Sequence, residues 1–295
     1  MNNINFTFII PHKDSPELLR RCINSIPNRD DIQIVVVDDN SSKENYPIVE
    51  RKDVEIISLT SENSNGAGHA RNVGLKHAKG KWILFADADD FYTDALDGFL
   101  DTYKNSDADV IYYNYHFIDS KSLSEISMSI DMQEYVNAIQ KEVCDNSDLD
   151  LIKFRLNVPW NKLVSKKFID INRIQFEEVM QGNDIWFTYQ VGYYNANSLL
   201  DKTIIYNYTR NQESITNKTH STRKSVAMLE SLVKQNAFYD FIGHPQWKFN
   251  IFLTILFSIK SSSDKLKLVL GYILSVKHIL LVRKKYIKLI NKGRN

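Results

Sequence analysis

The stretch KWILFADADDFYT spans residues 81–93 of this 295-residue chain. It begins with an apolar run typical of a strand buried on both faces, and it continues into the carboxylates Asp87, Asp89 and Asp90. Like charges this close together repel one another, so a positive partner is expected near them, and a bound metal ion is the usual one. The stretch therefore predicts a core strand that ends at a charged site.

Strand and helix patterns alternate on both sides of this stretch. Short apolar runs predict strands at residues 5–10, 32–39, 54–59, 81–86 and 109–117. Apolar residues at helical spacing predict helices at residues 15–26, 69–78 and 93–104. Ser15 is expected to cap the first of these helices. This succession implies an α/β fold with a mostly parallel open sheet, helices on both faces, and ligands bound outside the carboxyl ends of the strands.

Composition and charge narrow the class of protein. The chain is 43% hydrophobic, which allows a sizeable core, and its net charge of +1 argues against a nucleic-acid binder. Cys22 and Cys144 lack the spacing of a zinc site or a disulfide framework and fit a reducing compartment. The N-terminus has no secretory signal pattern, so we expect a cytoplasmic protein.

The C-terminal end has a different composition. From Lys248 onward, eleven Lys or Arg residues stand against a single acid, Asp264. Residues 247–295 have the pattern of two helices with more apolar residues than one core-facing stripe needs. Such helices suit an anionic membrane surface. Packing on the preceding domain or on a second subunit, as in a homo-oligomer, is the alternative.

Two acidic pairs fall at predicted strand ends. Asp87 and Asp89 form a D-x-D pattern that can hold Mg²⁺ or Mn²⁺, which bind one or two carboxylates and otherwise water and phosphate oxygens. The alternative is that Asp89 and Asp90 start a loop and cap the helix that follows. The second pair is Asp38 and Asp39. These residues also fit an ordinary turn, because Asp side chains often form hydrogen bonds with their own backbone there.

Glycines precede the predicted helix at residues 69–78. A backbone with glycines before a helix can approach a phosphate closely, and the helix N-terminus attracts anions. Arg71 falls in the first turn of that helix, where a cation is locally unfavourable and so often has an anionic partner. The alternative is a surface Arg paired with some acid.

The order and spacing of these pieces resemble the inverting family-2 glycosyltransferases, which have the GT-A fold. The segments that carry the resemblance are FIIPHKD (8–14), LLRRCINSI (18–26), IQIVVVDDNSS (32–42), GAGHARNVGLKHAKGKWILFADADD (66–90), PWNKL (159–163) and GNDIWF (182–187). The resemblance implies transfer of a sugar from a nucleoside diphosphate sugar, most commonly a UDP-sugar, to a glycan or lipid-linked acceptor in bacterial surface polysaccharide synthesis. It also implies peripheral attachment at the cytoplasmic face of the inner membrane, where such acceptors are met.

The resemblance further implies roles for single residues. It places the nucleotide sugar at Pro11, Asp14, Asp39, Arg71 and Asp87, and the metal at Asp89. It makes Asp184 the catalytic base. On the acceptor or diphosphate side it places Trp160, Lys162, Asn183 and Arg210. Trp160 as a core residue, Arg210 as a brace for its loop, and Asn183 or Asp184 as a helix cap are the structural alternatives.

The sequence departs from the family pattern in two segments. Residues 12–14 are His, Lys and Asp where an apolar or aromatic pair and Asn are usual, and Asn183 stands where a Glu is usual. The second departure leaves a non-catalytic relic that binds a glycan or nucleotide sugar as the alternative function. A sugar-nucleotide pyrophosphorylase is disfavoured, because no glycine-rich phosphate loop follows the first strand. We expect a transferase domain at residues 1–220 and a helical, basic extension at residues 221–295.

Overall fold

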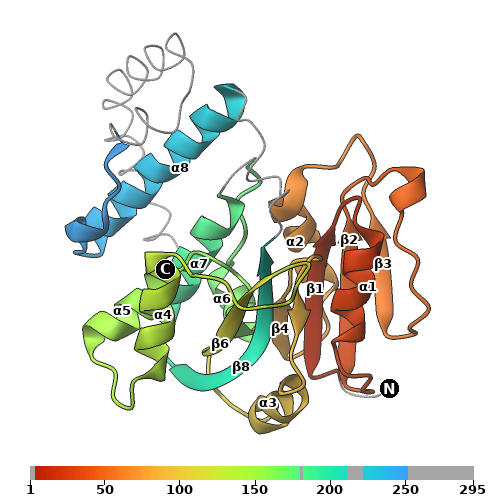
Figure 1. The fold of residues 1–295 in the computed structure, drawn as a ribbon, viewed down its shortest axis with the longest axis horizontal. Coiled ribbons are helices and arrows are strands. Elements are labelled where there is room, and N and C mark those ends of the chain that lie inside the picture. Colours follow the sequence, from red (N-terminus) through yellow and green to blue (C-terminus); the bar gives the residue numbers. More distant parts are fainter. Residues whose placement is uncertain (1–3, 180–181, 211–221, 252–295) are drawn as a thin grey trace. The chain divides into compact units, whose positions relative to one another are not determined.

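The structure is a computed structural model that describes residues 4–179, 182–210 and 222–251 (Figure 1). The chain divides into two compact units. One comprises Met1–Glu178 and Asn183–Thr216, and the other comprises Val179–Gly182 and Asn217–Asn295. The first unit contains the sheet and all the residues that the sequence nominated for the site.

One eight-stranded mixed sheet forms the first unit. In chain order its strands are β1 (Phe6–His12), β2 (Ile32–Asp38), β3 (Val54–Ser58), β4 (Trp82–Phe85), β5 (Phe91–Tyr92), β6 (Val110–Asp119), β7 (Lys162–Ser165) and β8 (Ser198–Arg210). Their order in space is β3-β2-β1-β4-β7-β6-β8-β5, and β7 and β5 run against the other six. The predicted open, mostly parallel sheet is therefore confirmed, with two reversed strands that the sequence did not indicate.

Helices cover both faces of the part of the sheet that the parallel strands β1–β4 form. Those of the first unit are α1 (Pro16–Asn24), α2 (Gly66–His77), α3 (Leu96–Tyr103), α4 (Ile130–Gln140), α5 (Asn146–Phe154), α6 (Lys166–Asn172) and α7 (Asn183–Tyr194), with a short 3-10 helix, η1 (Lys43–Asn45). Ile34 and Val36 of β2 belong to the cluster that contains Leu19 of α1, whereas the alternate residues Val35 and Val37 pack with Ala70 of α2. This two-sided covering explains why β2 is buried throughout and rich in β-branched residues.

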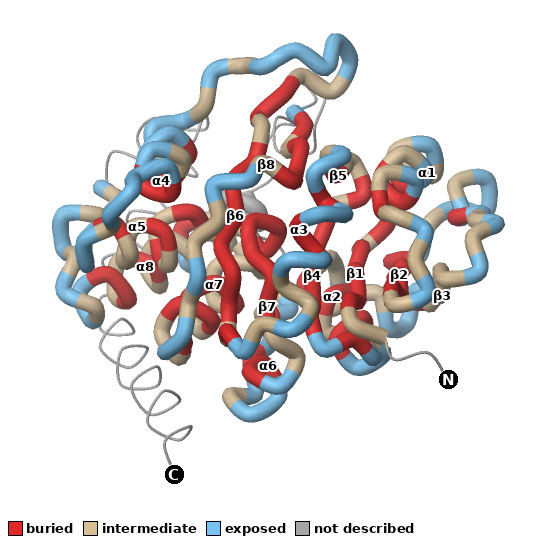
Figure 2. The backbone as a smooth tube through the Cα atoms, turned by 90° about the horizontal axis from the view of Figure 1, so that it is seen from below, coloured by how far each residue is buried: buried red, intermediate tan, exposed pale blue. Residues whose placement is uncertain are grey.

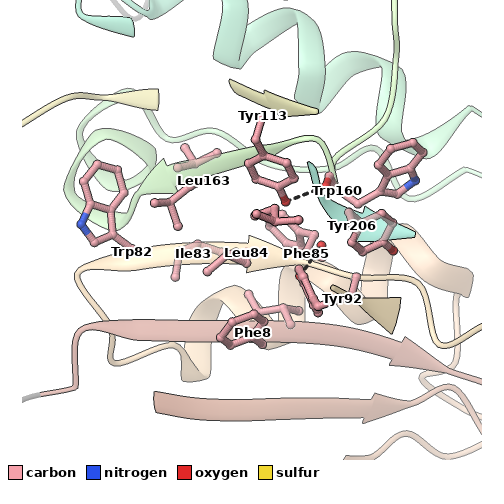
Figure 3. Packing of buried hydrophobic residues seen from close by; sticks show 14 of the residues in the cluster. Phe8, Trp82, Ile83, Leu84, Phe85, Tyr92, Tyr113, Trp160, Leu163 and Tyr206 are labelled. Atoms are coloured by element: carbon pink, nitrogen blue, oxygen red, sulfur yellow. Dashed lines mark hydrogen bonds between the residues drawn. The ribbon is translucent and has the colours of Figure 1, made fainter. Parts of the chain in front are cut away.

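The core runs through β4, where Trp82, Ile83, Leu84 and Phe85 are fully buried. Figure 3 shows these side chains between Phe8 of β1 and Leu163 of β7. Two tyrosine hydroxyls in this core donate to backbone carbonyls, Tyr113 to Trp160 (2.6 Å) and Tyr92 to Phe85 (3.2 Å). In Figure 2 the strands β1, β2, β4 and β6 are coloured as buried over most of their length. The residues after Phe85 are therefore carried on a rigid strand.

Two local expectations differ from the structure, and one segment without a predicted element folds into helices. The side chain of Ser15 does not cap α1, and its N–H donates instead to Nε2 of His12 (3.2 Å). The helix expected from residue 93 begins at Leu96, because residues 91–92 first pair with β8 as β5. Residues 120–150, polar and irregular in sequence, hold α4 and most of α5, and Asp145 caps α5 with a capping box.

The second unit contains α8 (Thr222–Phe241) and a short 3-10 helix, η3 (Pro245–Trp247). Within the described part of the chain, no helix is both long and apolar enough to cross a membrane. Most of the basic segment expected at a membrane surface lies at residues 252–295, outside the described residues.

Candidate active site

The carboxyl ends of β1, β2 and β4 lie together at one edge of the sheet, because these strands are parallel neighbours. His12 ends β1, Asp38 ends β2, and Asp87 follows β4 by two residues. The polar residues predicted at strand ends therefore meet at one edge, as the topology of parallel sheets requires.

Arg71 of α2 joins this edge to the start of α7. Its Nη1 donates to Oδ1 of Asp184 (2.5 Å) and to Oδ1 of Asn183 (2.9 Å), and its Nη2 donates to Oδ1 of Asp87 (2.6 Å). The side chain is 4% exposed and lies over the ring of Phe176, 5.4 Å from its centroid. Arg71 is thus paired with acids, and the acids are themselves candidate site residues.

The position of Arg71 within α2 differs from the expectation. The helix begins at Gly66, where φ is +80°, so Arg71 lies in the second turn rather than the first. The argument from an unfavourable first-turn cation was therefore wrong, and the carboxylates supply the reason for the Arg. A Cβ at Gly68 would lie 2.2 Å from the carbonyl oxygen of Glu177 and 2.9 Å from Cβ of Asn183. Glycine at position 68 lets α2 approach the start of α7.

Burial and charge act against each other in this cluster. Burial disfavours the charge on Arg71, but Asp184 and Asp87 outweigh it and raise the pKa of the guanidinium. Burial raises the pKa of Asp184 to about 6, a rise that Arg71 and Lys162 oppose and Asp87 increases. Asp184 is therefore ionised at neutral pH and close to the pKa at which a general base works well.

Asp90 is the structural member of the turn at residues 87–90, which we call the DADD turn. Its side chain is fully buried. One carboxylate oxygen accepts from the hydroxyl of Tyr206 (2.7 Å), and the other accepts from the N–H of Thr209 (2.7 Å). Burial, next to the charges of Asp89 and Asp87, raises the pKa of Asp90. Both of its oxygens are occupied, which leaves Asp87 and Asp89 to face a ligand.

Asp89 is the carboxylate of this turn that best fits a metal. No other described residue donates a hydrogen bond to its side chain. Burial and the charge of Asp87 raise the pKa of Asp89 to about 6, so a cation beside it would relieve an unfavourable setting. Within the described ranges, no three His, Cys, Asp or Glu side chains are grouped to hold a metal. The donor set fits Mg²⁺ or Mn²⁺ that takes its other ligands from water and a diphosphate.

The ends of β1 and β2 are tied to each other by buried polar contacts. Nδ1 of His12 donates to Oδ1 of Asp38 (2.8 Å), because its Nε2 is already used to accept the N–H of Ser15. Asp38 also accepts the hydroxyl (2.5 Å) and the N–H (3.1 Å) of Ser41. Asp38 therefore has the turn-forming role that the sequence predicts as the alternative to ligand binding.

The three nucleotide-side candidates at this end have different surroundings. Pro11 is half-buried within β1. Asp14 is exposed, with φ at +51°, and the N–H of Ser42 donates to its carboxylate (2.8 Å) and lowers its pKa. Asp39 is 6% exposed, and Oδ1 accepts the hydroxyl of Ser64 (2.8 Å). All three lie at the ends of β1 and β2.

Lys162 is a buried cation near the candidate base. It is fully buried, its Nζ donates to the carbonyl of Val158, and it lies 5.8 Å from the ring centroid of Tyr112. Thr188, one turn beyond Asp184 in α7, donates to the same carbonyl (3.4 Å). Burial lowers the pKa of Lys162 to about 7, although Asp184 opposes the shift. Lys162 has no exposed surface for a substrate and instead acts on Asp184 by its charge.

Within the described residues, no hydrogen bond or ion pair joins Trp160 or Arg210 to Arg71. Trp160 is 2% exposed and stacks on Tyr206 (5.0 Å between ring centroids) and Tyr208 (4.9 Å). The core alternative therefore fits Trp160 better than sugar stacking. Arg210 is exposed at the end of β8 and forms no ion pair with any residue in the described ranges.

Sequence reasoning missed the residues that hold the DADD turn. Tyr206 and Thr209 contact it from β8, and the guanidinium of Arg21 in α1 donates to the carbonyl of Asp89. The segment around Tyr206 is recognisable as a strand, but Asp90, which its hydroxyl contacts, lies 116 residues earlier in the chain. No local pattern gives that pairing.

Comparisons with known proteins agree on the family. The model of glycosyl transferase family 2 matches residues 7–160, just over half of the chain. Poly(ribitol-phosphate) beta-N-acetylglucosaminyltransferase TarS of Staphylococcus aureus is 35% identical over 95 residues, 30% of this chain and 17% of TarS. Poly(ribitol-phosphate) beta-glucosyltransferase of Bacillus spizizenii is 28% identical over 188 residues, 59% of this chain and 27% of that protein. The chain thus spans well under two thirds of the length of these relatives.

Solved structures give the same fold. The structure of S. aureus TarS 1–349 in complex with UDP-GlcNAc superimposes with a TM-score of 0.60 at 20% identity, over 89% of this chain and 69% of that one. Mannosyltransferase PcManGT from Pyrobaculum calidifontis, in complex with GDP-Man and Mn²⁺, superimposes with a TM-score of 0.52 at 12% identity, over 99% and 88%. At these identities the likeness supports the GT-A fold alone.

Proposed function

The chain belongs to glycosyl transferase family 2, and from this premise we propose that it transfers one sugar from a UDP-sugar to a hydroxyl group of a glycan or lipid-linked acceptor. The proposed role is in surface polysaccharide synthesis at the cytoplasmic face of the membrane. The relatives in S. aureus and B. spizizenii are named as poly(ribitol-phosphate) transferases, which supports a polymer or lipid-linked acceptor of bacterial origin.

The observation that carries the proposal is the fork of Arg71. One guanidinium holds Asp87, which follows β4, and Asp184, which begins α7, through bonds of 2.6 and 2.5 Å. A sugar transferase needs a donor-side group and a base close enough to face the same anomeric carbon. The shared guanidinium supports that proximity for two residues that are 97 positions apart in the chain.

On the donor side, we assign the base and ribose to Pro11, Asp14 and Asp39, and the ribose and diphosphate to Asp87 and Arg71. The ends of β1 and β2 are braced by the His12–Asp38 contact, which supports a fixed nucleotide pocket. Asp89 would hold Mg²⁺ or Mn²⁺, which when bound neutralises charge on the departing diphosphate. The Mn²⁺ complex of PcManGT supports this choice of metal.

On the acceptor side, we assign the base to Asp184. Oδ1 is engaged by Arg71, and Oδ2 accepts no hydrogen bond from any described residue, so Oδ2 is the oxygen that would take the acceptor proton. The attack would be a single in-line displacement with inversion at the sugar. Asn183 bonds Arg71 in place of the usual Glu, so its role here is to orient that guanidinium.

A donor panel tests the proposal most economically. The full chain is incubated with UDP-, GDP-, dTDP- and CMP-sugars, Mn²⁺ and a lipid or glycan acceptor mixture, and nucleotide release and product mass are followed by mass spectrometry. We expect release of UDP from one UDP-sugar, dependent on metal and on Asp184. Binding of a UDP-sugar with no turnover on any acceptor or water would favour the non-catalytic alternative. Absence of any nucleotide binding would refute the proposal.

A further inference from the structure

The DADD turn is fastened to β8 by four hydrogen bonds. The N–H of Asp87 donates to the hydroxyl of Tyr206 (3.0 Å), and that hydroxyl donates to Asp90 (2.7 Å). The N–H of Thr209 donates to the other oxygen of Asp90 (2.7 Å), and its hydroxyl donates to the carbonyl of Asp89 (2.7 Å). Two side chains of one strand therefore contact three of the four residues of the turn.

These contacts are out of water. Tyr206 and Asp90 are fully buried, and Thr209 is 4% exposed. A buried donor or acceptor that loses its partner keeps its desolvation cost without a compensating hydrogen bond, so the loss of one bond in the set destabilises the groups that remain. The four bonds act as a unit because the Tyr206 hydroxyl both accepts from Asp87 and donates to Asp90.

The chain after the turn is held to the same strand. Phe91 pairs with Asn207 and Tyr92 with Tyr206 in the antiparallel ladder of β5 and β8. The N–H of Thr93 then donates to the carbonyl of Ile205 (3.0 Å). This ladder fixes which residues of β8 face the turn, so Tyr206 is directed at it by the sheet register.

The turn needs such restraint because of its charge. Asp87 and Asp89 are like charges two residues apart, and without a bound cation their repulsion favours an opening of the turn. A metal site also demands carboxylates held within about half an ångström of the productive geometry. The contacts from β8 supply this restraint through groups that touch neither metal nor substrate.

Resting on the proposed function, we propose that Tyr206 and Thr209 are positioning residues that hold the DADD turn in the geometry that binds the metal–nucleotide complex. Their hydroxyls set the affinity for UDP in the presence of metal, and they leave the metal-independent contacts at the ends of β1 and β2 unchanged. Tyr206 acts through the backbone of Asp87 and the side chain of Asp90.

Strand β8 offers a matched control. Tyr208 lies two residues beyond Tyr206, and the rings of both stack on Trp160. No described residue forms a hydrogen bond with the Tyr208 hydroxyl. Tyr206→Phe and Tyr208→Phe therefore remove the same atom from similar stacks, but only the first breaks a contact with the turn. Thr209→Val keeps the shape of Thr209 and removes the bond to Asp89.

The first measurement is hydrogen exchange by mass spectrometry on the full-length variants. In Tyr206→Phe, peptides that cover residues 86–92 should exchange at least severalfold faster than in the wild type, because Asp87 loses its acceptor. Tyr208→Phe should exchange at the wild-type rate. Equal rates in the two variants would overturn the proposal whatever the enzyme does.

The second measurement is calorimetric titration of UDP with and without Mn²⁺. Tyr206→Phe and Thr209→Val should each lose about tenfold or more in affinity with Mn²⁺, partly recovered at higher Mn²⁺, and change less than about twofold without it. Tyr208→Phe should match the wild type. Faster exchange with unchanged Mn²⁺-dependent affinity would overturn the positioning role. A wild-type chain that binds no UDP would instead refute the proposed function and this role with it.

Discussion

The guanidinium of Arg71 is almost entirely out of water. Burial of this charge is unfavourable unless acidic groups in close contact offset the lost hydration. Asp87, Asp184 and Asn183 provide three acceptors within 2.9 Å, in a fork that only a guanidinium matches. Removal of one partner from such a buried ion pair destabilises the protein by more than the intact pair stabilises it. The site is therefore assembled around this side chain before any substrate binds.

The base assignment is tested with Asp184→Asn. The amide keeps a hydrogen-bond acceptor for Arg71 but cannot take a proton, so kcat should fall by about 10² or more. The affinity for UDP in the presence of Mn²⁺, measured by calorimetry, should stay nearly constant.

Asp94→Asn is the control, because Asp94 is an exposed carboxylate that lies beside Asn24 and Asp97, outside the proposed site. It should keep wild-type turnover. If Asp184→Asn retains most of its turnover, the base lies elsewhere, and Glu178 is the next residue to test.

The pH dependence of the reaction follows from the raised pKa of Asp184. The base must be ionised, so at saturating Mn²⁺ the value of kcat/KM should fall below about pH 6. The charge of Lys162 favours the ionised form, so Lys162→Met should move this acid limb to higher pH. Lys167→Met removes an exposed cation and should leave the limb in place. A limb that does not move in Lys162→Met would remove Lys162 from the electrostatics of the base.

For single residues, the sequence predicts location where the position along a strand determines the edge of the sheet at which a side chain lies. Asp39, Asp87 and Asp89 could be put at one edge because parallel strands end together. The partners of Arg71 could not be named, since Asp184 lies 113 residues away. Burial of Lys162 was also not predicted, because its strand, β7, inserts antiparallel into the middle of the sheet.

Among the elements, α2 and α7 depend on each other at Gly68. Alanine would gain about 1 kcal/mol of helix propensity there. Its Cβ, however, would meet the carbonyl oxygen of Glu177 at 2.2 Å, and that atom belongs to the backbone. Overpacking of this kind costs about 1–3 kcal/mol and exceeds the propensity gain.

We therefore expect Gly68→Ala to lower the free energy of unfolding and also kcat/KM, because Asn183 and Asp184 must shift with the start of α7. Urea denaturation and steady-state kinetics measure the two effects. Gly98→Ala, at the third residue of α3 with no atom within 4 Å of the added methyl group, should stabilise the protein by about 0.5–1 kcal/mol with unchanged kinetics. A Gly68→Ala variant as stable and active as the wild type would contradict the packing described for α2.

The elements themselves were largely readable from the pattern of apolar residues. The four parallel strands β1–β4 and helices α1–α3 fall within a few residues of the predicted ranges. The two reversed strands were not predicted, because β5 has only two residues and β7 only four. Both strands form because they pair with strands that are distant in the sequence. Periodicity in the local sequence does not predict that pairing.

For the whole molecule, the basic C-terminal segment bears on whether the protein binds to a membrane surface. Its eleven cations and apolar helix patterns led us to expect contact with an anionic membrane surface. The full chain should therefore sediment with liposomes that contain anionic lipid, and a chain without residues 247–295 should remain in solution while still binding UDP. Release by high salt alone would indicate a purely electrostatic contact. No sedimentation at low salt would contradict membrane attachment and favour packing or oligomerisation.

The central claim is that the carboxylates at the carboxyl edge of the sheet bind a nucleotide together with a metal. Titration of UDP into the wild type and into Asp89→Asn by calorimetry, each with and without Mn²⁺, tests it most directly. We expect Mn²⁺ to strengthen UDP binding to the wild type at least tenfold and to leave the weak binding to Asp89→Asn unchanged. An Asp89→Asn variant whose UDP affinity responds to Mn²⁺ as strongly as that of the wild type would contradict the claim.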